Sequence, residues 1–99
     1  METFRQVIEG PVPVLVDFYA TWCQPCKMMH PVLEQLKQTV GDRVRIVKLD
    51  VERNPQLAQA YGVQAVPTLL LFHEGELVWR QSGAQSKADL MALLDPFLK

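Results

Sequence analysis

The feature that most constrains the fold is a nearly continuous apolar run from Pro13 to Tyr19. Its β-branched and aromatic residues favour a strand, and apolar side chains at consecutive positions require cover on both of its faces. Apolar residues spaced three and four apart then predict a long amphipathic helix over Gln24–Val40, ended by Gly41. Val44–Val51 alternates like a second strand, and the helical connection makes the two strands parallel.

The rest of the chain predicts three more helices and a hairpin. In chain order these are a helix capped by Thr3 and ended by Gly10, a helix from Asn54-Pro55 to Gly62, strands at Thr68–Phe72 and Leu77–Gln81 around a turn at Gly75, and a helix opened by a Ser86–Asp89 capping box and running through Phe97. The order α-β-α-β-α-β-β-α predicts an α/β fold, a mixed sheet with helices on both faces.

Length, charge and cysteine content exclude several classes of protein. The 99 residues suit one domain, residues 1–99, and the formal net charge of −1 gives no reason to expect nucleic acid or an anionic membrane as a partner. No apolar run approaches the length of a membrane span, and Met1–Arg5 does not begin a secretory signal, so we expect a cytoplasmic location. Two cysteines are too few for a disulfide scaffold.

Both cysteines lie in Trp22-Cys23-Gln24-Pro25-Cys26, between the first strand and the long helix. Thiols at this spacing can close a small disulfide ring, and the helix N-terminus stabilises a thiolate there. Cys26 lies on the buried stripe of the helix, whereas Cys23 should be open to solvent, so Cys23 can attack a disulfide and Cys26 can resolve the product. A pair of core cysteines or half a metal site is the alternative, although a zinc site needs more ligands and only His30 is near.

Several other residues are candidates for a role beside this motif. Asp17 is a carboxylate in a strand that should be buried, which raises its pKa and suits a proton relay to Cys26, unless its head reaches water at the sheet end. Lys48 on the second strand, like His30, is expected to be solvated. Residue preferences favour a trans Val66–Pro67 bond, and Trp22 is equally consistent with a core aromatic or a recognition surface.

Taken together, these segments closely resemble the thioredoxin family from about Val12 to the C-terminus. The matching segments are Val16–Ala20, Trp22–Met28, Asn54-Pro55, Tyr61–Val63, Val66–Phe72, Gly75 and Ser82–Ala84. The resemblance implies a thioredoxin-like fold and a protein-disulfide reductase that is itself reduced by a separate thioredoxin reductase, with no cofactor beyond its dithiol and no metal. Carried over by position, it implies Cys23 as nucleophile, Cys26 as resolving thiol, Asp17 as the buried carboxylate with Lys48 as its neighbour, and a cis Pro67.

The same resemblance implies a surface that grips disulfide-containing substrate proteins. Its residues are Trp22, Pro25, Val66, Pro67, Gly83 and Ala84. Inside the motif, Gln24 stands where the family usually has Gly, and its side chain is placed to alter substrate approach and redox poise. Tyr19 and Ala65 replace a frequent Trp and Gly.

Few residues precede the first predicted strand, so we expect four strands rather than the family's usual five. The Val44–Val51 strand would then be an edge, where a monomer could pair weakly with a second copy. Other functions remain open at this point: a non-catalytic thioredoxin-like adaptor, or a disulfide isomerase or oxidase.

Overall fold

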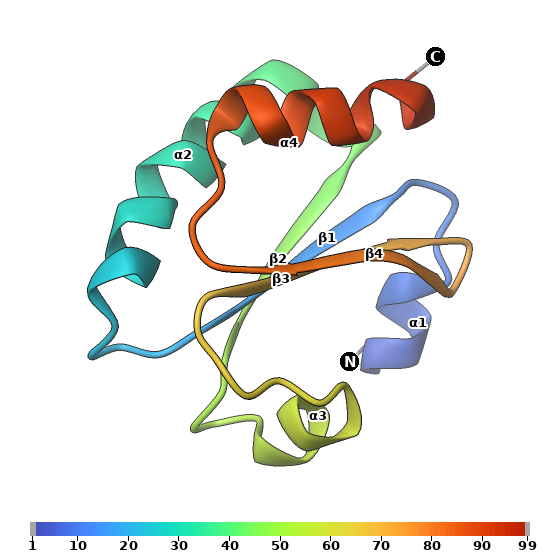
Figure 1. Ribbon diagram of the computed structural model, residues 1–99. Coiled ribbons are helices and arrows are strands. Elements are labelled where there is room, and N and C mark those ends of the chain that lie inside the picture. Colours follow the sequence, from blue (N-terminus) through green and yellow to red (C-terminus); the bar gives the residue numbers. More distant parts are fainter. Residues whose placement is uncertain (1, 99) are drawn as a thin grey trace.

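The computed structural model describes residues 2–98. It contains the eight predicted helices and strands in the predicted order, together with two 3-10 helices that were not predicted. They are α1 (Phe4–Ile8), β1 (Val14–Tyr19), α2 (Gln24–Val40), η1 (Gly41–Arg43), β2 (Arg45–Asp50), α3 (Pro55–Ala60), β3 (Thr68–His73), β4 (Glu76–Ser82), α4 (Lys87–Leu94) and η2 (Asp95–Phe97). The sheet lies between two layers of helices, with α2 and α4 on one face and α1 and α3 on the other (Figure 1).

Over residues 2–98 the sheet has four strands in the order β2-β1-β3-β4. β1 pairs in parallel with β2 and antiparallel with β3, and β3 and β4 form the antiparallel hairpin. The mixed four-stranded sheet and the edge position of β2 are therefore as predicted. Because β1 lies between β2 and β3, the segment that follows its carboxyl end starts from the interior of the sheet and not from an edge strand.

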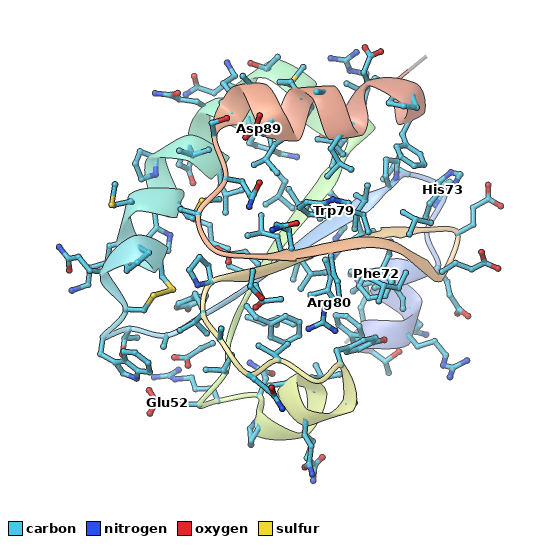
Figure 2. All side chains as sticks on the ribbon, viewed as in Figure 1. Glu52, Phe72, His73, Trp79, Arg80 and Asp89 are labelled. Carbon is cyan, nitrogen blue, oxygen red and sulfur yellow. A yellow bond between two sulfur atoms is a disulfide. The ribbon has the colours of Figure 1, made fainter. Side chains whose placement is uncertain are left out.

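Alternation along β1 sends its side chains into two separate cores. Leu15 packs with residues of α2 and α4, whereas Val14, Val16 and Phe18 pack with residues of α1 and α3. The same division continues across the sheet, because Trp79 of β4 lies on the α4 side and Phe72 of β3 lies beside α1 (Figure 2). The apolar run that first indicated a strand covered on both faces is thus buried on both.

The first helix has the predicted ends, whereas the last helix is shorter than predicted. Thr3 caps α1 in a reciprocal capping box with Gln6, and the helix ends at Ile8 with Glu9 as its C-cap, directly before the predicted stop at Gly10. Ser86 caps α4 by accepting a hydrogen bond from the Asp89 N–H, and α4 ends at Leu94. The prediction of a helix through Phe97 is wrong for the last turn: Pro96 has no N–H to continue the α-helical ladder, and the chain goes on as the 3-10 helix η2.

The hairpin turn holds β3 and β4 against α1. Glu74 and Gly75 both have positive φ, 53° and 86°, as a two-residue hairpin turn requires. The Gly75 N–H donates to the carbonyl of Ile8 at 2.9 Å, and a β-carbon at this position would lie 3.1 Å from Cγ of Glu9. Glycine therefore supplies both the turn conformation and the close approach to the end of α1.

Candidate functional site

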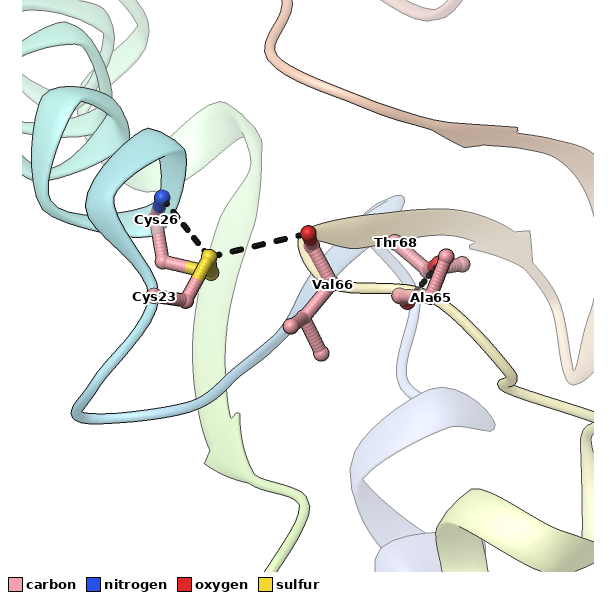
Figure 3. The surroundings of a disulfide bond; sticks show 5 residues. All are labelled: Cys23, Cys26, Ala65, Val66 and Thr68. Atoms are coloured by element: carbon pink, nitrogen blue, oxygen red, sulfur yellow. Dashed lines mark hydrogen bonds between the residues drawn. A yellow bond between two sulfur atoms is a disulfide. The ribbon is translucent and has the colours of Figure 1, made fainter.

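Cys23 and Cys26 form a disulfide at the start of α2, one short segment after the carboxyl end of β1 (Figure 3). Cys23 is the N-cap residue of α2, and its Sγ accepts a hydrogen bond from the Cys26 N–H at 3.2 Å. Pro25 lies in the first turn, where a helix makes no use of a backbone N–H. The reactive pair is thus fixed by the same residues that begin the helix.

The exposure of the two cysteines differs less than predicted. Cys26 is fully buried, as expected, but Cys23 is only 4% exposed, so the prediction that it is open to solvent is wrong. The pair packs against Tyr19, Val51 and Val66, which come from three different parts of the chain. The helical phase of α2 correctly places Cys26 inward, but it carries no information about the segments that cover Cys23.

The segment before β3 lies beside the disulfide. The Val66–Pro67 peptide bond is cis, as the family resemblance implies and contrary to the preference of X-Pro bonds in general. The Val66 carbonyl oxygen lies 3.6 Å from Sγ of Cys23, and the Pro67 carbonyl accepts a hydrogen bond from the Gly83 N–H at 2.8 Å. This arrangement brings Val66, Pro67 and Gly83 together near the sulfur, with Ala84 exposed next to Gly83.

Trp22 is 67% exposed, which excludes the core-aromatic interpretation. Gln24 and Pro25 are exposed on the other side of Cys23. A groove of about 310 Å³ runs from Trp22 past Val51 to the segment before the cis proline, and its lining residues are Trp22, Val51, Val63, Gln64, Ala65 and Val66. One lining residue, Val66, has its carbonyl oxygen 3.6 Å from Sγ of Cys23, so the groove reaches the neighbourhood of the disulfide.

Asp17 lies in the middle of β1 on the face covered by α2 and α4, the face of Leu15. Its side chain is fully buried, and neither carboxyl oxygen has a hydrogen-bond partner among residues 2–98. Burial raises the pKa of Asp17 to about 6, and the positive charge of Lys48 opposes part of that rise. The alternative in which the carboxylate reaches water is therefore wrong.

Lys48 stands opposite Asp17 in the register of β1 and β2, but it does not hydrogen-bond to that carboxylate. Its Nζ lies 3.2 Å from Nδ1 of His30 and 3.8 Å from Oε1 of Glu34, both on α2. The expectation that His30 is simply solvated is thus wrong. Lys48 is partly exposed and, as expected, is not a hydrogen-bond partner of Asp17, and it is the neighbour of Asp17 that the resemblance implies. The sequence held a signal for the contact with His30, because Lys48 shares a strand face with Ile46, which is partly buried against the core beneath α2.

Two findings concern other kinds of site. Among residues 2–98, no three His, Cys, Asp or Glu side chains are grouped so that they could hold a metal ion. In the same range, none of the helices has the length and apolar character needed to cross a membrane.

Comparisons with known proteins agree with this geometry. The Thioredoxin family model matches residues 1–96. A thioredoxin of Bacillus subtilis is 48% identical over 85 residues, 86% of this chain and 82% of the relative. A thioredoxin-like protein of Synechocystis sp. is 45% identical over 96 residues, 96% of this chain and 91% of the relative. The crystal structure of a Malassezia sympodialis thioredoxin superposes with a TM-score of 0.86 at 39% identity, over 97% of this chain and 84% of that one.

Proposed function

This chain belongs to the thioredoxin family and is a protein-disulfide oxidoreductase that works by dithiol–disulfide exchange, and we propose the role of each site residue in that exchange. The observation that carries the proposal is the Cys23–Cys26 disulfide at the N-terminus of α2, beside the cis Val66–Pro67 bond and the exposed Trp22. This is the oxidised half of a two-electron cycle.

In the reduced protein, the Cys23 thiolate attacks one sulfur of a substrate disulfide. The substrate S–S bond breaks, a mixed disulfide with Cys23 forms, and the first substrate thiolate leaves and takes up a proton. Cys26 then loses its proton and attacks Sγ of Cys23, which releases the second substrate thiol and closes the disulfide. The substrate gains two electrons and two protons. The Cys23–Cys26 pair supplies both electrons, and it releases one proton when Cys23 ionises and the other when Cys26 attacks.

Asp17 is the proposed proton acceptor for Cys26. Cys26 lies on the buried stripe of α2, and Asp17 lies on the sheet face that α2 covers. Because burial raises the pKa of this carboxyl to about 6, it is close to the range in which a group both accepts and returns a proton near neutral pH. A buried base is needed here, because Cys26 itself is fully buried.

The substrate-binding surface is proposed to consist of residues on both sides of the sulfur. Trp22, Gln24 and Pro25 lie on the α2 side, and the other members are Val66, Pro67, Gly83 and Ala84. A protein segment that carries a disulfide would lie in the groove beside Trp22, where its backbone passes the cis proline. The apolar walls of the groove favour apolar side chains next to the substrate cysteine.

We further propose that the protein works as a monomer in the cytoplasm and draws electrons from a thioredoxin reductase, with no bound cofactor beyond its own dithiol. In a reducing compartment such as the cytoplasm, a cysteine pair serves redox chemistry rather than structural cross-linking, which is the use proposed for Cys23 and Cys26. The charged side chains of Arg45 and Lys48 on the edge strand β2 disfavour pairing with a second copy.

Insulin reduction, followed by turbidity with dithiothreitol as electron donor, tests the function. We expect wild type to accelerate the reduction, Cys23→Ser to abolish the acceleration, and an exposed control on the same helix, Gln38→Ser, to match wild type. If the chain instead binds disulfide-containing proteins but does not accelerate insulin reduction, it is an adaptor. In a trapping experiment Cys26→Ser should accumulate a mixed disulfide on Cys23, and accumulation on Cys26 in the Cys23→Ser variant would reverse the two roles.

A further inference from the structure

His30, near the start of α2, contacts the charged residue Lys48 on the neighbouring strand β2. His30 lies four residues after Cys26, hence one helical turn further along α2. Its Nδ1 is 3.2 Å from Nζ of Lys48 on β2, and its ring meets the ring of Tyr19 edge-on at 5.8 Å. An ammonium group has only donors, so Nδ1 is the acceptor and the neutral imidazole carries its proton on Nε2.

Lys48 is also the cation aligned with Asp17. The two residues are partners in the register of β1 and β2, and the charge of Lys48 lowers the pKa that burial raises. Yet the Asp17 carboxyl has no hydrogen-bond partner among residues 2–98, and the ammonium of Lys48 is turned to His30 and Glu34. The separation between this ammonium and this carboxyl therefore depends on what else binds the ammonium.

We propose that His30 is a positioning residue, which holds the Lys48 ammonium away from Asp17 and so keeps the carboxyl able to accept and return a proton. The inference rests on the proposed proton-transfer role of Asp17. The charged and titratable groups around the contact are Glu34 and Lys37 on α2, Tyr19 on β1 and Lys48 on β2. Glu34 is largely exposed and 3.8 Å away, so His30 supplies the shorter, more sheltered partner of the ammonium.

Replacing His30 tests the proposal through the titration of Asp17. In His30→Leu the ammonium loses its acceptor and is drawn to the unpartnered carboxylate, so the Asp17 midpoint, measured from its ¹³C carboxyl shift, should fall by about 0.5 pH unit. In His30→Asn the amide oxygen stands near the place of Nδ1, so the midpoint should stay close to that of wild type. The pH dependence of mixed-disulfide resolution should move down with the midpoint in His30→Leu alone.

Lys48→Met is the control for action through the cation. This variant should raise the Asp17 midpoint, and adding His30→Leu to it should then change nothing. An unchanged midpoint in His30→Leu, or a shift that persists in the Lys48→Met background, would overturn the proposal. A rise in His30→Leu would also overturn it, because His30 would then be holding the cation toward the carboxyl. The Asp17 midpoint is measured without catalytic turnover. A midpoint that contradicts this proposal can therefore be told apart from a wild-type protein that fails to reduce insulin, which would contradict the proposed function.

Discussion

The two faces of the central sheet bury very different groups. On the α1 and α3 face, Phe4, Tyr61 and Phe72 form a ring cluster with centroids 5.5–5.7 Å apart. On the α2 and α4 face, the fully buried cluster has no aromatic ring, and Trp79 and Phe97 pack against it only partly buried. This face also buries the carboxyl of Asp17, which lacks a hydrogen-bond partner within residues 2–98. The side chains of β1 point alternately to the two faces, so this one strand contributes to both cores.

The difference shows how a small domain divides stability from chemistry. Aromatic packing on the α1 and α3 face stabilises the fold and touches none of the reactive residues. Burial of a carboxyl on the other face destabilises the fold at neutral pH, because the charged form loses its hydration. The first face therefore stabilises the scaffold in which the second keeps a buried carboxyl under α2.

The largest expected effect is on the aromatic face. Phe72 is 1% exposed and meets both other rings edge-on, so Phe72→Ala should lower the free energy of unfolding by about 3–5 kcal/mol. Insulin reduction by the protein that remains folded at 25 °C should match wild type. Denaturant unfolding and the insulin assay check both points, and a loss of activity in the folded variant would show that the two faces are not independent.

Asp17→Asn should have the opposite effect on stability. The pKa of Asp17 is about 6 in the folded protein against 3.8 for a free group, so the folded state binds more protons between these values and wild-type stability falls as pH rises through them. At pH 7 the neutral amide should be more stable by about 3 kcal/mol, and the gain should vanish near pH 4.

Unfolding of oxidised Asp17→Asn at pH 4 and pH 7 measures this, with Asp42→Asn at an exposed position as the control. Asp42→Asn should leave the pH dependence as it is in wild type. A gain for Asp17→Asn that is equal at both pH values would show that packing, and not charge, is responsible.

Gln24→Gly should alter redox poise more than stability. Gln24 is exposed in the first turn of α2, next to the Cys23 sulfur, so its side chain affects hydration of the thiolate and the flexibility of the ring. We expect the potential measured against glutathione to change by up to about 30 mV, equivalent to about 1.4 kcal/mol, with a nearly constant thermal midpoint. An unaltered potential with a large loss of stability would assign Gln24 to packing.

Trp22→Ala should have the smallest effect on stability, within about 0.5 kcal/mol, because the indole is 67% exposed. Its effect should fall on substrate binding, with a rise in KM for a protein disulfide of about five- to tenfold. Steady-state kinetics with insulin and with a small disulfide separate the two contributions. Equal losses for both substrates would argue against a protein-binding role.

Most of the fold was predictable from local periodicity. The bounds of α2 were predicted residue for residue, and the two strands around it were placed within one residue of the observed ends. The register slip in the hairpin between Leu71 and Phe72, and the shortening of the last helix at Pro96, arise from local backbone geometry that hydrophobic periodicity does not report.

The site was predicted less completely, because it is built from distant segments. Cys26 and Asp17 were expected to be buried from their positions in α2 and β1, where periodicity is strong. Cover over Cys23 comes from Val51 and Val66, and the partner of Lys48 comes from α2, so neither follows from the pattern within one element. The cis state of Pro67 was accessible only through the family resemblance.

The N-cap of α2 is itself the reactive sulfur. In each catalytic cycle the acceptor of the Cys26 amide proton changes from a disulfide sulfur to a thiolate, a charged and therefore stronger acceptor at the positive end of the helix dipole. Fraying of the first turn of α2 should thus be more frequent in the oxidised protein, and amide hydrogen exchange at Cys26 faster. The oxidation state of the cysteine pair thus changes how often the first turn of α2, a seventeen-residue helix, opens, even before any substrate is bound.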